Sequence, residues 1–125
     1  MNLNQVTIPA INIEESVTFY RTMGFKPIVL TDSYARFESI EGDSTFSIDK
    51  IDSPSAPSNI VIYFEVDDLA ETHKRLLGEG IIFKSPPRDE EWLWSEARLL
   101  DPAGNQICIY HAGDNRKNPP WKVGV

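Results

Sequence analysis

Few side chains in this sequence are of types that could carry out chemistry. The 125 residues include one cysteine, Cys108, and two histidines, His73 and His111. The sequence has no Cys-x-x-Cys pair and no cysteine–histidine spacing typical of a zinc site. One cysteine cannot form an internal disulfide, and no histidine is placed to activate Cys108 as a nucleophile. We therefore expect Cys108 to be a small buried side chain and His73 to lie on a helix. His111 is expected to cap the end of a strand or to lie at the mouth of a cavity.

Acidic residues outnumber basic ones, 19 to 12, which gives a net charge of −7 and a pI near 4.7. An acidic chain is a poor partner for nucleic acid or for an anionic membrane, and it accommodates a cationic or neutral small ligand more easily. Glu90 and Glu91 are expected in a solvated loop that could attract such a cation. The longest apolar stretch, residues 60–64, is too short to span a bilayer, and residues 1–6 lack the layout of a signal peptide. We expect a cytoplasmic protein.

The secondary-structure elements that must position these residues form an internal repeat of two copies. Each copy reads as a strand, a capped helix, a glycine stop and further short strands. Asn12 and Asp68 can each accept a hydrogen bond from the residue three positions later, which is a glutamate in both copies. An offset of 56 residues relates Gln5 to Val61, Ile13 to Leu69, Glu15 to Glu71 and Gly24 to Gly80.

Each predicted helix has one apolar face and ends at a glycine. Gly24 and Gly80 predict the helix ends, because a residue with positive φ just after a helix favours glycine. Apolar residues at helical spacing predict the buried faces. These faces are Ile13, Val17, Tyr20 and Met23 in the first helix, and Leu69, His73, Leu76 and Leu77 in the second.

Short strands complete each copy. They are expected at 25–30, 34–40 and 45–50 in the first copy, and at 81–84, 93–100 and 106–110 in the second. A second loop is expected at 85–91, and the ring of Trp121 is expected to dock onto the domain or a neighbouring subunit. We predict one domain over residues 1–125, made of module one at about 3–50, a linker at 51–58, module two at about 59–111 and a tail at 112–125.

The pattern predicts an α+β fold of two βαβββ modules. Each module has fewer than sixty residues and would bury too little apolar surface alone. The modules are therefore expected to pack together, within one chain or across a homodimer. Two curled mixed sheets, each with a helix on its outside, would enclose a cleft.

With these elements in place, the sequence resembles the vicinal oxygen chelate superfamily, which includes glyoxalase I, extradiol dioxygenases, fosfomycin-modifying enzymes and bleomycin resistance proteins. The resemblance covers about residues 3–111. It is carried by Val6-Thr7-Ile8-Pro9 with residues 16–20, by Phe64-Glu65-Val66-Asp67-Asp68-Leu69, and by Asp101-Pro102-Ala103-Gly104-Asn105. It implies the glyoxalase/bleomycin resistance fold. Because this fold hosts several chemistries, the residues of the site must decide the function.

In metal-dependent members of the superfamily, histidine and glutamate side chains from the first and last strands of each module chelate a divalent ion. Carried over by this resemblance, those positions are Gln5, Ser47, Val61 and Cys108. Valine cannot ligate, and the other three offer weak or mismatched donors. A two-residue change of register would bring in Thr7, Asp49, Tyr63 and Tyr110, still with one carboxylate and no histidine. We therefore expect no metal and no cofactor.

The same positions define the residues expected to line the cleft, because side chains on one face of a strand recur every two residues. Trp92, Trp94 and Glu96 approach the second sheet, where bleomycin-binding relatives carry a Trp-Gly stretch and this chain has Leu93 instead. Aromatic faces with a few carboxylates suit a flat or cationic ligand. The expected ligand-binding residues are Gln5, Thr7, Arg36, Ser47, Asp49, Val61, Tyr63, Trp92, Trp94, Glu96, Cys108 and Tyr110.

Structural roles compete with these assignments. Either tryptophan could pack against a helix, and Glu96 could pair only with Arg98 or Arg36. Our preferred hypothesis is a homodimer that sequesters a small aromatic or cationic molecule without catalysis, as in the non-metal, bleomycin-resistance-like branch of the superfamily and as antibiotic resistance would require. Two alternatives stay open: a metal-dependent lyase, isomerase or dioxygenase with a non-standard ligand set, and an interaction module with a vestigial cleft.

Overall fold

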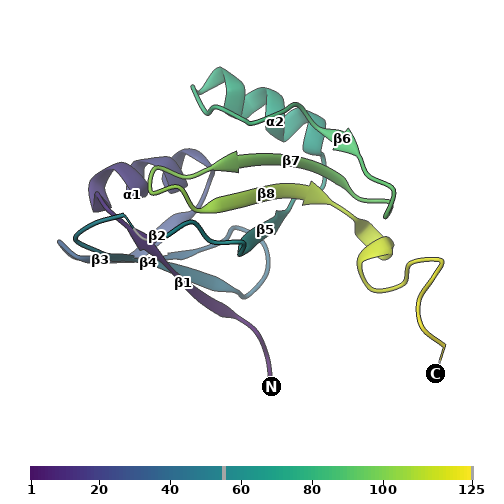
Figure 1. Cartoon of the computed structure of the whole chain (residues 1–125), viewed down its shortest axis with the longest axis horizontal. Coiled ribbons are helices and arrows are strands. Elements are labelled where there is room, and N and C mark those ends of the chain that lie inside the picture. Colours follow the sequence, from purple (N-terminus) through teal and green to yellow (C-terminus); the bar gives the residue numbers. More distant parts are fainter. Residues whose placement is uncertain (55, 125) are drawn as a thin grey trace. The chain divides into compact units, whose positions relative to one another are not determined.

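The computed structural model describes residues 1–54 and 56–124. The chain forms two compact units (Figure 1). The first contains residues 1–59 together with residues 101–105, and the second contains residues 60–100 and 106–125. No helix among the described residues is long and apolar enough to cross a membrane.

Each unit holds one helix and one four-stranded mixed sheet, which confirms the α+β fold of two βαβββ modules. In the first unit the sheet order is β1-β4-β3-β2, with β1 and β4 parallel and the other pairs antiparallel. Its elements are β1 Gln5–Ala10, α1 Ile13–Thr22, β2 Lys26–Leu30, β3 Tyr34–Glu38 and β4 Thr45–Lys50.

The second unit repeats this plan. Its sheet order is β5-β8-β7-β6, again with the first pair parallel. Its elements are β5 Val61–Glu65, α2 Leu69–Gly78, β6 Arg88–Asp89, β7 Ser95–Leu100 and β8 Gln106–His111, followed by a short 3₁₀ helix, Gly113–Arg116.

Both helices begin and end where the sequence predicts. The Asn12 side chain accepts a hydrogen bond from the backbone N–H of Glu15, and Asp68 accepts one from Glu71. These caps satisfy amide donors that have no partner within the helix. Gly24 has φ of +108° and Gly80 has φ of +89°, so both adopt the left-handed conformation that terminates a helix.

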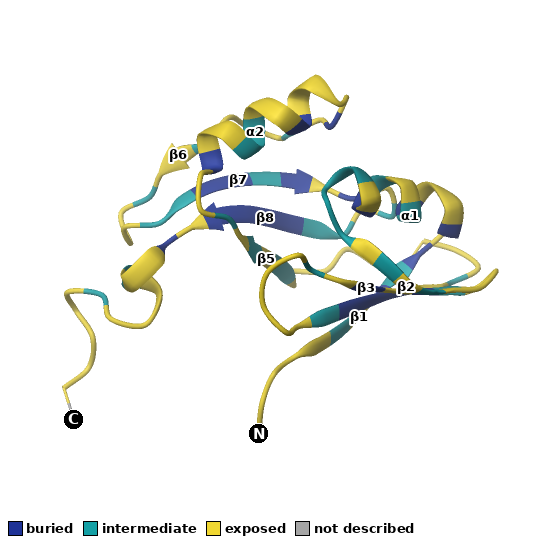
Figure 2. Cartoon of the chain, turned by 180° about the vertical axis from the view of Figure 1, so that it is seen from behind, coloured by how far each residue is buried: buried dark blue, intermediate teal, exposed yellow. Residues whose placement is uncertain are grey.

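Aromatic rings form the core of the first unit. Tyr20 of α1 is fully buried, and its ring centroid lies 4.8 Å from that of Phe46 and 5.6 Å from that of Phe37. Phe37 and Phe46 stack on each other across β3 and β4. The buried residues of β3 and β4 are dark blue in Figure 2. This packing places α1 on one face of its sheet and leaves the alternate side chains of β3 and β4 on the other.

The turn at residues 101–105 supplies the polar centre of the first unit. Asp101 is buried, and the Tyr20 hydroxyl donates to its Oδ2 at 2.6 Å. The same carboxylate accepts the backbone N–H groups of Ala103 and Asn105 and the Asn105 side-chain amide. Asn105 also donates to the Pro9 carbonyl at 2.8 Å. Burial, together with the adjacent Asp101 carboxylate, raises the pKa of Tyr20 far above its ordinary value, so this phenol stays protonated and donates.

Three local predictions for the second unit are wrong. Residues 81–84 form no strand; Ile81 is buried but Ile82 is exposed, and sheet pairing occurs instead at Arg88–Asp89, inside the predicted loop 85–91. Pro86 and Pro87, which have no N–H to donate, separate the apolar run from the strand that pairs. Leu77 is exposed, because α2 buries Leu69 and Leu76 on a narrower stripe.

Candidate functional site

The first sheet has a polar face opposite its helix. The register places Thr7 and Arg36 beside Ser47, and Asp49 beside Tyr34. Because aligned residues share a face, these side chains lie together, opposite Phe37 and Phe46. We call this surface the polar face; it consists of Gln5, Thr7, Tyr34, Arg36, Thr45, Ser47 and Asp49. Every residue of the first unit that the sequence assigned to a cleft lies on it.

A chain of hydrogen bonds organises the polar face. The Gln5 amide donates to the Ser47 hydroxyl at 2.7 Å, and the hydroxyls of Ser47 and Tyr34 lie 2.6 Å apart. The Arg36 Nε donates to the Tyr34 oxygen at 2.9 Å, and the Arg36 guanidinium lies over the Tyr34 ring. The Thr45 hydroxyl donates to the Gln5 carbonyl oxygen. Ser47 is therefore held on both sides and has no freedom to turn toward another group.

The second sheet carries an aromatic cluster on one face. Tyr63 of β5 is aligned with Cys108, and Glu96 of β7 is aligned with Tyr110. The ring of Trp94 stacks on that of Tyr110 with centroids 4.8 Å apart, and Tyr63 meets both edge-on. We call this surface the aromatic face; it consists of Val61, Tyr63, Trp92, Trp94, Glu96, Arg98, Cys108 and Tyr110. Every residue of the second unit that the sequence assigned to a cleft lies on it.

A buried carboxylate fixes two neighbours on the aromatic face. The Glu96 side chain is 3% exposed and accepts hydrogen bonds from Arg98 at 2.9 Å and from the Trp92 indole at 2.8 Å. Arg98 also donates to the Tyr63 hydroxyl at 3.0 Å, with its guanidinium over that ring. The predicted Glu96–Arg98 ion pair is confirmed, and it also positions two of the aromatic rings.

Trp92 and Tyr63 present the most open rings of this surface, at 43% and 40% exposure. Tyr110 is buried, and the Trp94 indole donates to the Asn115 carbonyl. The exposed rings could contact a ligand, and of the two, Tyr63 packs edge-on against Tyr110.

Leu93, which lies between Trp92 and Trp94, has a strained backbone conformation. It has φ of +66°, and among the described residues it is the non-glycine residue with positive φ. Its N–H donates to the Glu90 carbonyl, and the Glu90 N–H donates to the Trp94 carbonyl. A left-handed residue other than glycine costs about 1–2 kcal/mol. The structure thus gives a physical reason why glycine would suit this position.

Replacing Leu93 with glycine is expected to raise the free energy of unfolding by about 1 kcal/mol, because the strain of the left-handed backbone is removed. Urea unfolding followed by tryptophan fluorescence measures this change. Leu100→Gly is the matched control: Leu100 is similarly exposed but lies in β7 with ordinary φ, so that variant is expected to be less stable than the parent. A loss of stability in Leu93→Gly would contradict the prediction.

Cys108 is a buried thiol, as predicted. It is fully buried beside Tyr110 and Ala112, with Val61 and Trp94 packed against the group. Burial, with the Glu96 carboxylate nearby, raises the pKa of the Cys108 thiol to about 12. Since the thiolate is the reactive form, a thiol with a raised pKa is a poor nucleophile at neutral pH.

The four positions that the superfamily resemblance assigns to metal ligands do not fit a divalent ion. Gln5 and Ser47 are neutral donors bonded to each other, Val61 has no donor atom, and Cys108 is a protonated thiol. A divalent site of this kind requires about three good protein ligands. Within residues 1–54 and 56–124, no three His, Cys, Asp or Glu side chains are grouped to hold a metal ion.

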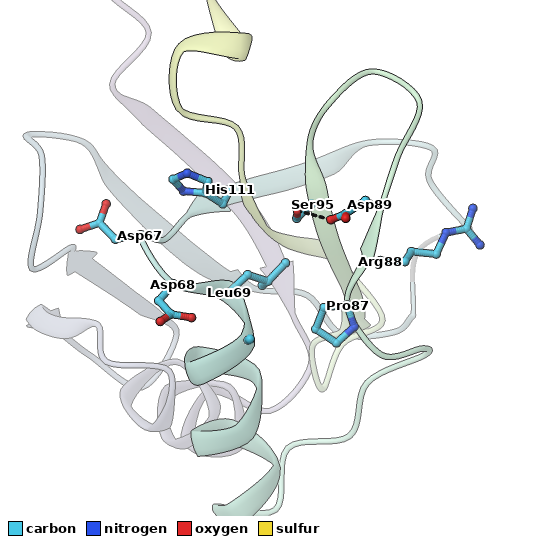
Figure 3. Close-up of a pocket in the computed structure, with 9 residues that line it drawn as sticks. Asp67, Asp68, Leu69, Pro87, Arg88, Asp89, Ser95 and His111 are labelled. Atoms are coloured by element: carbon cyan, nitrogen blue, oxygen red, sulfur yellow. Dashed lines mark hydrogen bonds between the residues drawn. The ribbon is translucent and has the colours of Figure 1, made fainter.

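A hollow of about 340 Å³ in the second unit was not predicted from the sequence. It lies at the N-terminal end of α2, where Figure 3 shows His111 and Asp67 on one side and Asp89, hydrogen-bonded to Ser95, on the other. The His111 ring bonds to the Val66 carbonyl at 2.8 Å. Of its lining residues, His111 is the one that the sequence placed at a possible cavity mouth. The other lining residues are Asp68, Leu69, Ala70, Pro87 and Arg88.

Comparison with known proteins places this geometry in a family. A family model described as Glyoxalase/Bleomycin resistance protein/Dioxygenase superfamily matches residues 2–109. No curated protein matches the chain.

Several solved structures share the fold. A glyoxalase/bleomycin resistance protein/dioxygenase from Nocardioides matches with a TM-score of 0.79 at 18% identity, over 99% of this chain and 90% of that one. A bleomycin-binding protein complexed with bleomycin matches with a TM-score of 0.72 at 22% identity, over 89% of this chain and 98% of that one. A lactoylglutathione lyase from Agrobacterium tumefaciens matches with a TM-score of 0.71 at 17% identity, over 88% of this chain and 92% of that one. At these identities the likeness shows the fold, which binding proteins and enzymes share.

Proposed function

Because the chain belongs to the Glyoxalase/Bleomycin resistance protein/Dioxygenase superfamily, we propose that it binds a small aromatic or cationic molecule on its aromatic face and holds it without chemical conversion. The observation that carries the proposal is the ring cluster of Tyr63, Trp94 and Tyr110, with the exposed ring of Trp92 anchored by Glu96. A bleomycin-binding protein shares the fold, which supports small-molecule binding as the role.

Stacking and electrostatics both favour this ligand class. Flat rings gain about 0.5–1.5 kcal/mol from each well-oriented aromatic contact beyond the area they bury. A cation over a tryptophan or tyrosine face gains a similar amount at exposed sites. The net charge of −7 raises the local concentration of cations around the chain.

Binding without conversion rests on the chemistry of the donor set. The positions that the superfamily resemblance assigns to metal ligands are occupied here by Gln5, Ser47, Val61 and Cys108. Sequestration requires only affinity, and mass action then lowers the free concentration of a toxic compound. A homodimer in the cytoplasm is part of the proposal, and sedimentation velocity of the purified protein tests the dimer.

A titration with acridine orange, a flat aromatic cation, tests the proposal. The dye is expected to quench tryptophan fluorescence and to raise the melting temperature, since a ligand that binds only the folded state stabilises it. Trp92→Ala is expected to weaken binding about tenfold, which corresponds to about 1.4 kcal/mol of lost stacking and cation–π attraction. Trp92 is exposed, so this variant is expected to keep its fold.

Trp121→Ala is the matched control, because Trp121 is also exposed but lies in the tail, outside the aromatic face. It is expected to bind the dye as the parent does. Equal weakening in both variants, or no melting shift with the dye, would contradict the proposal. Stoichiometric divalent metal in the purified protein, with a melting temperature lowered by EDTA, would favour the metal-dependent alternative instead.

A further inference from the structure

On the polar face of the first sheet, one hydroxyl hydrogen has no acceptor among the described residues. The Gln5 amide, the Ser47 hydroxyl, the Tyr34 hydroxyl and the Arg36 Nε form one continuous chain of hydrogen bonds. Two of these groups, Ser47 and Tyr34, can both donate and accept. The direction of the hydrogen bond between them decides whether the Tyr34 hydroxyl can donate to a ligand.

The groups at the two ends of this series of hydrogen bonds, the Gln5 amide nitrogen and the Arg36 Nε, are both donors. The Gln5 carbonyl oxygen accepts from Thr45, and its amide nitrogen lies 3.4 Å from the Val6 carbonyl oxygen, which can only accept. The nitrogen of Gln5 therefore faces Ser47, and the Ser47 oxygen accepts. At the other end the Arg36 Nε can only donate, so the Tyr34 oxygen accepts as well.

The burial of Ser47 sets the direction of the central bond. Its side chain is fully buried, and a buried hydroxyl hydrogen without an acceptor costs about 1–3 kcal/mol. Tyr34 is the acceptor in reach for it among the described residues, at 2.6 Å. Ser47 therefore donates to Tyr34, and the phenolic hydrogen of Tyr34, which has no acceptor among the described residues, points toward solvent or a bound ligand. The pKa of Tyr34 lies below its ordinary value because Ser47 and Arg36 both hydrogen-bond to its oxygen.

The Arg36 guanidinium adds charge beside this phenol. No carboxylate of the described residues lies within 4.0 Å of it, whereas Arg98, Arg88 and Arg116 each have a glutamate within that distance. Arg36 is exposed, and its contacts with the described residues are the Nε hydrogen bond to Tyr34 and the packing of its guanidinium over the Tyr34 ring. Its terminal nitrogens are thus positioned donors with no carboxylate to neutralise them.

We propose that Arg36 and Tyr34 form a binding site for the carboxylate of a small molecule. A planar carboxylate can accept from a guanidinium N–H with one oxygen and from a nearby hydroxyl with the other. A monoanion suits the site better than a doubly charged phosphate, since Arg36 is its one cation and Asp49 lies on the same face. All of these residues belong to the first unit, so the proposal does not depend on ligand binding at the aromatic face.

Calorimetric titration with sodium benzoate, against sodium chloride at the same ionic strength, tests this site. Saturable binding is expected, together with shifts confined to the backbone amides of β3 and β4 in ¹H–¹⁵N spectra. Arg36→Gln is expected to abolish the binding. Tyr34→Phe is expected to weaken it at least tenfold, as for loss of a hydrogen bond to a charged group. Inorganic phosphate is expected to bind less tightly than benzoate.

Two further variants make the result decisive. Arg21→Gln removes the same charge from α1, where no ion pair of the described residues holds Arg21, and it is expected to bind benzoate as the parent does. Tyr34→Phe leaves the buried Ser47 hydroxyl without its acceptor, so the double variant Tyr34→Phe/Ser47→Ala, which removes both groups, is expected to preserve folding.

The double variant is expected to show the same loss of affinity as Tyr34→Phe. The site would be overturned by full benzoate affinity in Tyr34→Phe or in the double variant, or by an absence of saturable binding to the parent. Weakening in Arg21→Gln equal to that in Arg36→Gln would also overturn it. Acridine orange binding at the aromatic face is read separately, so failure of one proposal is distinguishable from failure of the other.

Discussion

Replacing Asp101 with alanine is expected to lower the free energy of unfolding by about 3–5 kcal/mol, the largest effect among the polar substitutions considered for this chain. The carboxylate accepts four hydrogen bonds, one of them from the buried hydroxyl of Tyr20 at 2.6 Å. Alanine leaves all four donors without this partner. Tyr20 then has a buried hydroxyl that no water reaches.

Urea unfolding with a matched pair of variants measures this effect. Tyr20→Phe removes only one of the four donors and leaves Asp101 bonded to Ala103 and Asn105, so its expected cost is about 1–2 kcal/mol. The double variant Tyr20→Phe/Asp101→Ala is expected to be less destabilised than the sum of the single variants, because the two groups interact directly. An Asp101→Ala variant within 1 kcal/mol of the parent would show that the network contributes little.

Replacing Arg98 with leucine is expected to lower the free energy of unfolding by about 3 kcal/mol at neutral pH. Glu96 is 3% exposed, so loss of Arg98 leaves a buried charge that neutral groups such as the Trp92 indole hydrogen-bond but do not neutralise. Breaking a buried pair from one side generally costs about 3–5 kcal/mol, and the 39% exposure of Arg98 places this pair at the lower end.

Arg88→Leu is the matched control, because the side chain of Arg88 is 72% exposed and its pair with Glu90 is at the surface. Surface pairs contribute about 0–1 kcal/mol, so this variant is expected to remain close to the parent. Replacing Glu96 and Arg98 together with leucine is expected to recover most of the loss, since no unpaired charge remains. Equal losses in Arg88→Leu and Arg98→Leu would contradict the assignment of Glu96 as a buried charge.

Features set by neighbouring residues could be predicted from the sequence. Helix caps at Asn12 and Asp68 act within three residues, and the glycine stops depend on one φ angle each, so local spacing was sufficient. The superfamily resemblance, supported by the repeat, placed Ser47 and Cys108 on the last strand of each module, and they lie on β4 and β8. The register also sets each beside an arginine, Arg36 in one unit and Arg98 in the other, which was not predicted.

Features set by distant partners could not be predicted. Asp101 reads as a turn residue, and nothing nearby in the sequence shows that its partner Tyr20 lies 81 residues away. The run Ile81-Ile82-Phe83 has the composition of a strand, but a strand also requires a partner in register. The segment that pairs with the edge of β7 is Arg88–Asp89 instead. The direction of the Ser47–Tyr34 hydrogen bond depends on burial, which composition does not report.

The membership of residues 101–105 in the first unit has a consequence for biosynthesis. A ribosome that has released residues 1–59 has made the helix cap Asn12, the glycine stop Gly24 and all four strands of the first sheet, but not the acceptor for the Tyr20 hydroxyl. That phenol waits without its partner while the following 41 residues, 60–100, emerge. The first unit therefore completes its polar centre only after residues 60–100 of the second unit have been translated, so its final ordering is expected to lag behind the synthesis of its own strands.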